Sequence, residues 1–207
     1  MEAILHIDLI GILKTIFNTA GIGYIIIFGI IFAESGLLIG FFLPGDSLLF
    51  TAGLLASQGI ISLWILIVVV IVAAISGDTV GYWFGHKVGP MIFKREDSRI
   101  FKKENLMRAE KFYERHGAKT IVLARFIPFI RTFAPIVAGV GNMKYRTFLI
   151  YNIAGGIVWA VSVPIAGYYL FRYIPNIDKY LLPIILLIIV ISAIPAILEF
   201  IRSKKKK

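Results

Sequence analysis

The chain has 207 residues, 58% of them hydrophobic, and a formal net charge of +10. Its mean hydropathy of +0.86 lies far above that of soluble domains, so the sequence indicates an integral membrane protein with one membrane domain. The absence of cysteine excludes disulfides and thiolate metal sites. The basic residues flank apolar stretches, a pattern typical of membrane topology, which argues against nucleic-acid binding.

Two apolar segments of different kinds open the chain. Residues 1–20 are apolar but interrupted by charged side chains, which predicts an interfacial amphipathic helix. Residues 22–57 are broken at Pro44-Gly45, where proline removes a hydrogen-bond donor and glycine lets the backbone turn. The arm after this break is only about 16 Å long, whereas a bilayer core needs about 30 Å. We therefore expect residues 22–57 to form a re-entrant hairpin.

A span, an aqueous segment and a second broken stretch follow. Residues 61–85 are long enough to cross a bilayer. Residues 86–119 hold ten Lys and Arg against five Asp and Glu, so the positive-inside rule places this segment in the cytoplasm. Residues 120–143 repeat the broken apolar pattern, with Pro128 and Pro135 as the interruptions. They predict a second re-entrant hairpin.

The last part of the chain completes a repeated plan. Residues 145–171 and 180–201 are both of spanning length, and the basic tail 202–207 is expected in the cytoplasm. Each hairpin precedes a span, and the two hairpins open to opposite sides, as in the inverted repeats of secondary transporters. The predicted fold class is an all-α polytopic membrane protein with two oppositely oriented re-entrant helical hairpins. The side of the N-terminus and association into a homo-oligomer stay open.

Four charged residues lie within the two broken segments: Glu34, Asp46, Arg125 and Arg131. Each costs roughly 2.5–3.5 kcal/mol on membrane-insertion scales, which indicates a function. Guanidinium forks match phosphate oxygens, so the two arginines are candidate phosphate ligands. On a straight helix they would point about 120° apart, but a kink at Pro128 lets them converge. The structural alternative is that each arginine only neutralises Glu34 or Asp46.

The carboxylates are candidate proton-coupling groups. A carboxylate that loses its arginine partner to a ligand binds a proton more readily, which would couple proton uptake by Glu34 and Asp46 to substrate movement. Asp46 is equally well placed to cap a helix that starts at Leu48. Asp78 is a candidate accessory residue, with the alternatives that it lies at the membrane interface and reaches water or that it makes only a packing contact.

Motifs of the common enzyme and ATPase classes are missing from the chain. The sequence has no Gly-x-x-x-x-Gly-Lys-Ser/Thr loop, no His-Glu-x-x-His and no Gly-x-Ser-x-Gly. Its three histidines all lie outside the broken segments. We therefore expect a protein that is not an enzyme and that binds no cofactor or metal.

Four motifs between residues 30 and 160 carry a family resemblance. They are Glu34-Ser-Gly-Leu-Leu with Leu43-Pro44-Gly45-Asp46-Ser47; Gly77-Asp78 with Gly81-Tyr82 and Gly85; Arg125-x-x-Pro128-x-x-Arg131 with Ala138-Gly139; and Asn152 with Gly155 and Trp159. Their arrangement resembles the DedA family, also called the SNARE-associated or VTT-domain family. The resemblance implies facing re-entrant hairpins, dependence on the proton motive force, and essential residues at Glu34, Asp46, Arg125 and Arg131.

The resemblance also implies a class of substrate. Bacterial members of the family are implicated in returning undecaprenyl phosphate across the membrane or in moving glycerophospholipids such as phosphatidylethanolamine, and eukaryotic relatives scramble phospholipids. We therefore expect a multi-pass inner (plasma) membrane transporter with a cytoplasmic C-terminus, whose partners are protons and a lipid with an anionic phosphate headgroup. Undecaprenyl phosphate is the first choice of substrate. The alternatives are a glycerophospholipid flippase or scramblase, a proton-coupled transporter of small ions or drugs, and a scaffold whose charges serve only folding.

Overall fold

The computed structural model describes residues 15, 21–37, 43, 45–93 and 117–172, and every regular element within these ranges is an α-helix. The expected interfacial helix, most of the expected cytoplasmic segment, the last span and the basic tail lie outside the described residues, Thr15 excepted.

The first three described helices agree with the break expected near residue 44, which lies between the first and the second of them. Helix α2 covers Ile22–Gly36 and ends where Leu37 adopts an extended backbone. Helix α3 covers Gly45–Ser57, so Asp46 lies inside its first turn and does not precede a helix that starts at Leu48. A carboxylate in that turn stabilises the helix, because it interacts favourably with the positive end of the helix dipole. Helix α4 then runs without a break over Leu63–Phe93.

The second half of the described chain contains another interrupted pair and another long helix. Helix α6 covers Lys119–Ala124, α7 covers Pro128–Val140 and α8 covers Tyr145–Arg172. Pro128 begins α7, where its missing N–H is not needed. The break expected at Pro135 is not found, because α7 continues through this residue. Membrane helices tolerate an internal proline where neighbouring groups compensate for the lost hydrogen bond.

Two of the described helices are long and apolar enough to cross a membrane. They are Leu63–Val88 within α4 and Tyr145–Leu170 within α8, each of 26 residues. At 1.5 Å per residue each is roughly 39 Å long, more than the bilayer core of about 30 Å. Helix α2, with 15 residues, is only about 22 Å long and cannot cross it alone. The long helices correspond to the expected spans 61–85 and 145–171, with α4 extending eight residues further, to Phe93.

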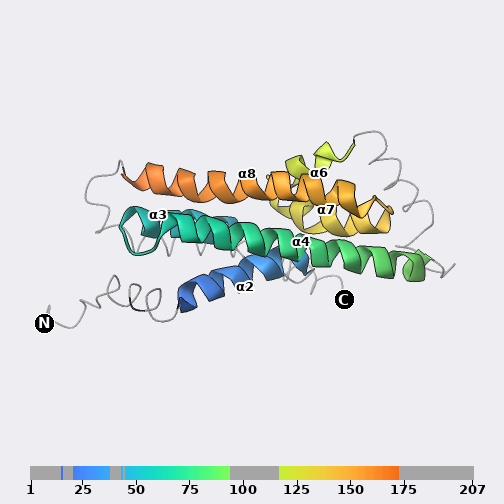
Figure 1. Cartoon of the computed structure of the whole chain (residues 1–207), viewed down its shortest axis with the longest axis horizontal. Coiled ribbons are helices and arrows are strands. Elements are labelled where there is room, and N and C mark those ends of the chain that lie inside the picture. Colours follow the sequence, from blue (N-terminus) through green and yellow to red (C-terminus); the bar gives the residue numbers. More distant parts are fainter. Residues whose placement is uncertain (1–14, 16–20, 38–42, 44, 94–116, 173–207) are drawn as a thin grey trace, which may run out of the picture.

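The two long helices form the frame of an elongated bundle (Figure 1). Helix α4 packs against α2, α7 and α8, whereas α3 packs mainly against α8. The short α6 contacts both α7 and α8. In Figure 1, α3 and α7 lie toward opposite ends of the bundle, and each lies beside one of the long helices.

Glycines allow backbone contact at three helix crossings. At each crossing, a Cβ added to a glycine on either helix would overlap the backbone of the other. The glycines are Gly36 and Gly77 between α2 and α4, Gly53 and Gly167 between α3 and α8, and Gly85 and Gly139 between α4 and α7. Small residues at such positions are typical of helix packing in membranes, where close approach gives the van der Waals contact that holds helices together.

Several polar side chains are buried between the helices beside an apolar core, and many large apolar side chains are exposed on the outside. The buried polar residues are Glu34, Ser35, Asp78, Arg125, Arg131, Thr132 and Asn152. On the outside, Trp64 is 75% exposed and Ile25 and Leu123 are each 67% exposed. A soluble protein would leave few such apolar side chains in contact on its surface, whereas a bilayer solvates them.

The glycine crossings predict which small substitutions destabilise the bundle. Replacing Gly53 with alanine should cost about 1–3 kcal/mol, because the new methyl group meets the backbone carbonyl of Pro164. The matched control is Gly29→Ala on the exposed side of α2, where a Cβ meets nothing within 4 Å. Thermal unfolding in detergent, followed by size-exclusion chromatography, measures both variants. Equal stability of the two variants would contradict the proposed packing role.

Candidate functional site

Arg131 is the centre of one buried charge cluster. Its side chain is 1% exposed and projects from α7 toward the end of α2 and the start of α3. Its Nη2 group donates to Glu34 Oε1, and its Nη1 group donates to Asp46 Oδ1 at 2.8 Å. Glu34 is almost as buried as the arginine, but the Asp46 side chain is 38% exposed. This cluster therefore has one side accessible from outside the bundle, through Asp46.

Trp159 of α8 is an uncharged member of the same cluster. The guanidinium carbon of Arg131 lies 4.6 Å from the centre of the indole ring, within the range of a cation–π contact. The indole Nε1–H donates to Asp46 Oδ1 at 2.9 Å, the same oxygen that accepts from Arg131. Trp159 is 2% exposed and Arg131 1%, so the contact between ring and guanidinium is shielded from solvent, whereas the bond to Asp46 is only partly buried.

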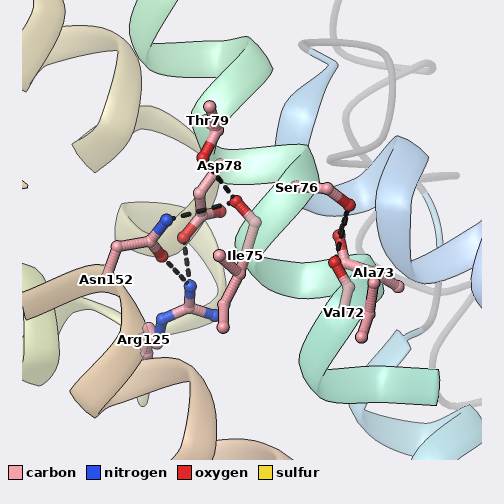
Figure 2. A network of polar contacts seen from close by, with 8 residues as sticks. All are labelled: Val72, Ala73, Ile75, Ser76, Asp78, Thr79, Arg125 and Asn152. Atoms are coloured by element: carbon pink, nitrogen blue, oxygen red, sulfur yellow. Dashed lines mark hydrogen bonds and ion pairs between the residues drawn. The ribbon is translucent and has the colours of Figure 1, made fainter. Parts of the chain in front are cut away.

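Arg125 is the centre of a second cluster, shown in Figure 2. It follows α6 directly, and its Nη2 group donates both to Asp78 Oδ2 of α4 and to Asn152 Oδ1 of α8. Asn152 in turn donates from Nδ2 to the carbonyl oxygen of Ile75 at 3.2 Å. Arg125 and Asp78 are each 2% exposed and Asn152 is fully buried, so this cluster is closed on every side.

Glycines make room for the charged side chains. A Cβ at Gly45 would overlap the Glu34 carboxylate, so the first residue of α3 has to be small for Glu34 to reach Arg131. On α8, a Cβ at Gly155 would come within 3.0 Å of Arg125 Cδ, and one at Gly156 within 3.5 Å of its Nη2. The arginine therefore lies in a slot that these two glycines leave open.

The two clusters influence each other electrostatically. The guanidinium groups of Arg125 and Arg131 repel one another, and Asp78 attracts Arg131 as well as its own partner. The clusters contain two arginines and three carboxylates, a formal charge of −1 when all are ionised. Within the described residues, Nε and Nη1 of Arg125 and Nε of Arg131 are buried without a hydrogen-bond partner. The site thus keeps unused donors next to an excess of negative charge.

The structure changes the pairing that the sequence suggested. Of the predicted site residues, it brings Arg131, Glu34 and Asp46 together, so Arg131 has both carboxylates that the structural alternative divided between the two arginines. Arg125 pairs instead with Asp78. The alternative that Asp78 reaches water at an interface is wrong, because it is 2% exposed in the interior of α4.

Sequence reasoning gave no chemical role to two members of the clusters, Asn152 and Trp159. Both appeared only as parts of a weak family motif. A signal was present in Asn152, a polar side chain inside a spanning helix seven residues before a tryptophan. On an α-helix, seven residues correspond to about two turns, so both side chains share one face of α8.

Among the described residues, no three His, Cys, Asp or Glu side chains are grouped to hold a metal ion.

The fold and the site together define a class: a helical membrane protein with charged residues buried between its helices. Comparison with known proteins identifies the family. The VTT domain matches residues 43–169, and the chain is 43% identical over 207 residues to Protein DedA of Escherichia coli K12, covering 99% of this chain and 94% of the relative. The chain belongs to the DedA family of membrane proteins, as its motifs indicated.

Other relatives are also described as membrane proteins. A Mycobacterium leprae protein described as an uncharacterized membrane protein is 47% identical over 169 residues, which are 82% of this chain and 75% of the relative. The Escherichia coli K12 inner membrane protein YqjA is 32% identical over 186 residues, 84% of each chain. No solved structure matches the chain. The family assignment rests on sequence alone.

The closed cluster predicts a large cost for removing its carboxylate. Asp78→Ala leaves the Arg125 charge buried without an ionic partner and should destabilise the protein by about 3–5 kcal/mol. The matched control is Ser76→Ala on the same helix, because the Ser76 hydroxyl bonds only to carbonyl groups of its own helix, at 2.6 Å and 3.1 Å, and points away from the cluster in Figure 2. That change should stay within about 0.5 kcal/mol.

Thermal unfolding of the two variants in detergent distinguishes these expectations. Asp78→Asn provides an intermediate case, since it keeps an acceptor for Arg125 but loses the charge. A midpoint for Asp78→Ala equal to that of Ser76→Ala would show that Arg125 finds another partner, and the importance assigned to the pair would be wrong.

Proposed function

We propose that this protein is a transporter that moves a lipid with an anionic phosphate headgroup across the membrane, most specifically undecaprenyl phosphate. One observation carries the proposal: Arg131 is held between two carboxylates inside the bundle, and one of these, Asp46, is accessible from outside. A headgroup that approaches Asp46 reaches a guanidinium group that it can bind. Guanidinium groups recognise phosphate oxygens through paired, charge-assisted hydrogen bonds.

Binding would proceed by exchange of partners. The phosphate takes the place of Glu34 and Asp46 on Arg131, and the unused Nε group of this arginine adds a donor. Two ionised carboxylates that have lost their arginine and lie beside an anionic headgroup are strongly unfavourable at membrane depth. They therefore take up protons. The formal charge of −1 in the resting clusters supports this coupling, because an added anion increases the imbalance. Arg125 would contribute its own two unused donor atoms when the headgroup enters more deeply.

The proposed transport path lies between two re-entrant hairpins of an inverted repeat. In this proposal α2 and α3 form one hairpin and α6 and α7 the other, each followed by a span. The packing supports a two-fold relation, because α3 packs on the span of the other half, α8, and α7 packs on the span of the first half, α4. The Ala-Gly pairs at 52–53 and 138–139 occupy corresponding crossings. Such repeats place the substrate site between them, near the midplane.

The proposal includes a location and a set of partners. The protein acts in the inner membrane with its C-terminus in the cytoplasm, in agreement with the basic residues at 86–119 and 202–207. It requires protons and a lipid substrate, needs no cofactor and catalyses no covalent reaction.

Reconstitution in proteoliposomes tests the transport function. The wild-type protein should move the headgroup of undecaprenyl phosphate faster when a pH gradient is imposed. Arg131→Lys should reduce the rate at least about tenfold, because an ammonium group cannot form the two-point fork. The matched control is Arg146→Lys on the exposed surface of α8, which should leave the rate unchanged.

The lipid comparison separates the alternatives. Movement of both undecaprenyl phosphate and phosphatidylethanolamine would identify a general scramblase, and the specific recycling role would be abandoned. If the wild-type protein moves neither lipid, the proposed function is wrong, and a small-ion transporter or a scaffold takes its place.

A charge reversal separates transport from folding. If the Arg131–Glu34 pair serves only the fold, the double variant Arg131→Glu with Glu34→Arg should restore both stability and cellular function that each single variant loses. For a phosphate transporter the double variant should recover stability but not translocation, because the guanidinium group has moved from α7 to α2. Recovery of translocation in this variant would contradict the phosphate-binding role of Arg131.

A further inference from the structure

Trp159 lies at the point where the Arg131 cluster would have to open for a ligand. It contacts both of the groups that would separate: Arg131 through the ring face at 4.6 Å and Asp46 through the indole N–H at 2.9 Å. The side chain is among the largest that are fully enclosed in the described part of the chain. Its ring is packed within the main apolar core, so it has little freedom to move.

The face of α8 that carries Trp159 gives an uncharged contact to each arginine. Asn152, two turns earlier, accepts from Arg125, and Trp159 provides its ring to Arg131. Neither contact depends on whether a carboxylate is ionised. The α8 face therefore gives each arginine a contact that is independent of its salt bridges.

We propose that Trp159 is a positioning residue for phosphate recognition. Its ring keeps the Arg131 guanidinium in place, and its N–H group stays bonded to Asp46. Arg131 and Asp46 can then separate while each still has one partner. This inference rests on the proposed function, and it assigns a role to a side chain that bears no charge. During exchange, Arg131 turns its donors from the carboxylates to the phosphate while the ring continues to cover one face. Asp46 stays on the indole N–H.

The physical argument is one of compensation. A guanidinium group that leaves its carboxylates in a dry interior loses most of its stabilisation unless another group remains in contact. An indole ring is the best aromatic partner for a cation, and the contact is strongest where water is excluded. Since Trp159 is 2% exposed, the ring provides this contact without competition from water.

A spectroscopic experiment tests the contact directly. The chain has three tryptophans, so replacing Trp64 and Trp83 with phenylalanine leaves Trp159 as the single emitter. Dodecyl phosphate, added to this protein in detergent, should change the Trp159 emission in a saturable manner, and uncharged dodecanol should not. The matched control keeps only Trp64, which is 75% exposed at the start of α4, and should show no saturable change.

A transport experiment separates positioning from simple packing. Trp159→Phe keeps a ring beside Arg131 and should change the half-saturating concentration of undecaprenyl phosphate by less than about fivefold. Trp159→Leu removes the ring and should raise it about 5- to 30-fold, with the maximal rate per folded protein largely kept. A purely structural role would instead lower stability and maximal rate in both variants and leave the half-saturating concentration unchanged, which would overturn the inference.

The outcomes distinguish this inference from the proposed function. If wild-type protein transports undecaprenyl phosphate and dodecyl phosphate inhibits it, but Trp159 emission stays constant over the inhibitory range, the positioning role is wrong and the transport function stands. If the wild type neither transports the lipid nor responds to dodecyl phosphate, both fail. A saturable emission change that disappears in Arg131→Gln, with folding verified by size-exclusion chromatography, supports the positioning role.

Discussion

The buried arginines are the constraint on which the rest of this structure depends. An arginine at membrane depth requires a charged partner, and neither Arg125 nor Arg131 has one on its own helix. The partners lie 47, 85 and 97 residues away along the chain. Each ion pair can form only when several helices pack in one arrangement, so the cost of burying charge selects the fold.

Close helix packing makes these ion pairs possible. Helices that meet at glycine crossings exclude lipid and water from the space between them, and the arginines lie in the spaces that remain. Gly45 is the sharpest example, because its missing side chain is the volume that the Glu34 carboxylate occupies. The same residue type therefore serves both the packing of the bundle and the geometry of the site.

The two clusters differ in their access to the outside of the bundle. Arg125, Asp78 and Asn152 are all enclosed, and they tie α4 and α8 to the end of α6. The Arg131 cluster reaches the outside through Asp46, and it adds an aromatic contact that does not depend on charge. In the proposed exchange of partners, the closed cluster would keep the helices in place while the accessible one binds the ligand.

The sequence by itself determined the membrane class, the family and the unusual charged residues. It also determined the two helix interruptions, at Pro44-Gly45 and before Pro128. These features depend on composition and on local backbone chemistry, which neighbouring residues reveal. The helical course through Pro135 was not predictable in this way, because the packing around a proline decides whether the chain turns there. Likewise, only the tertiary structure decided that Arg131 holds both Glu34 and Asp46, that Arg125 pairs with Asp78, and that Trp159 belongs to the site. Pairing over such separations is set by helix crossings, and helix crossings are set by the fit of whole surfaces that no short motif describes.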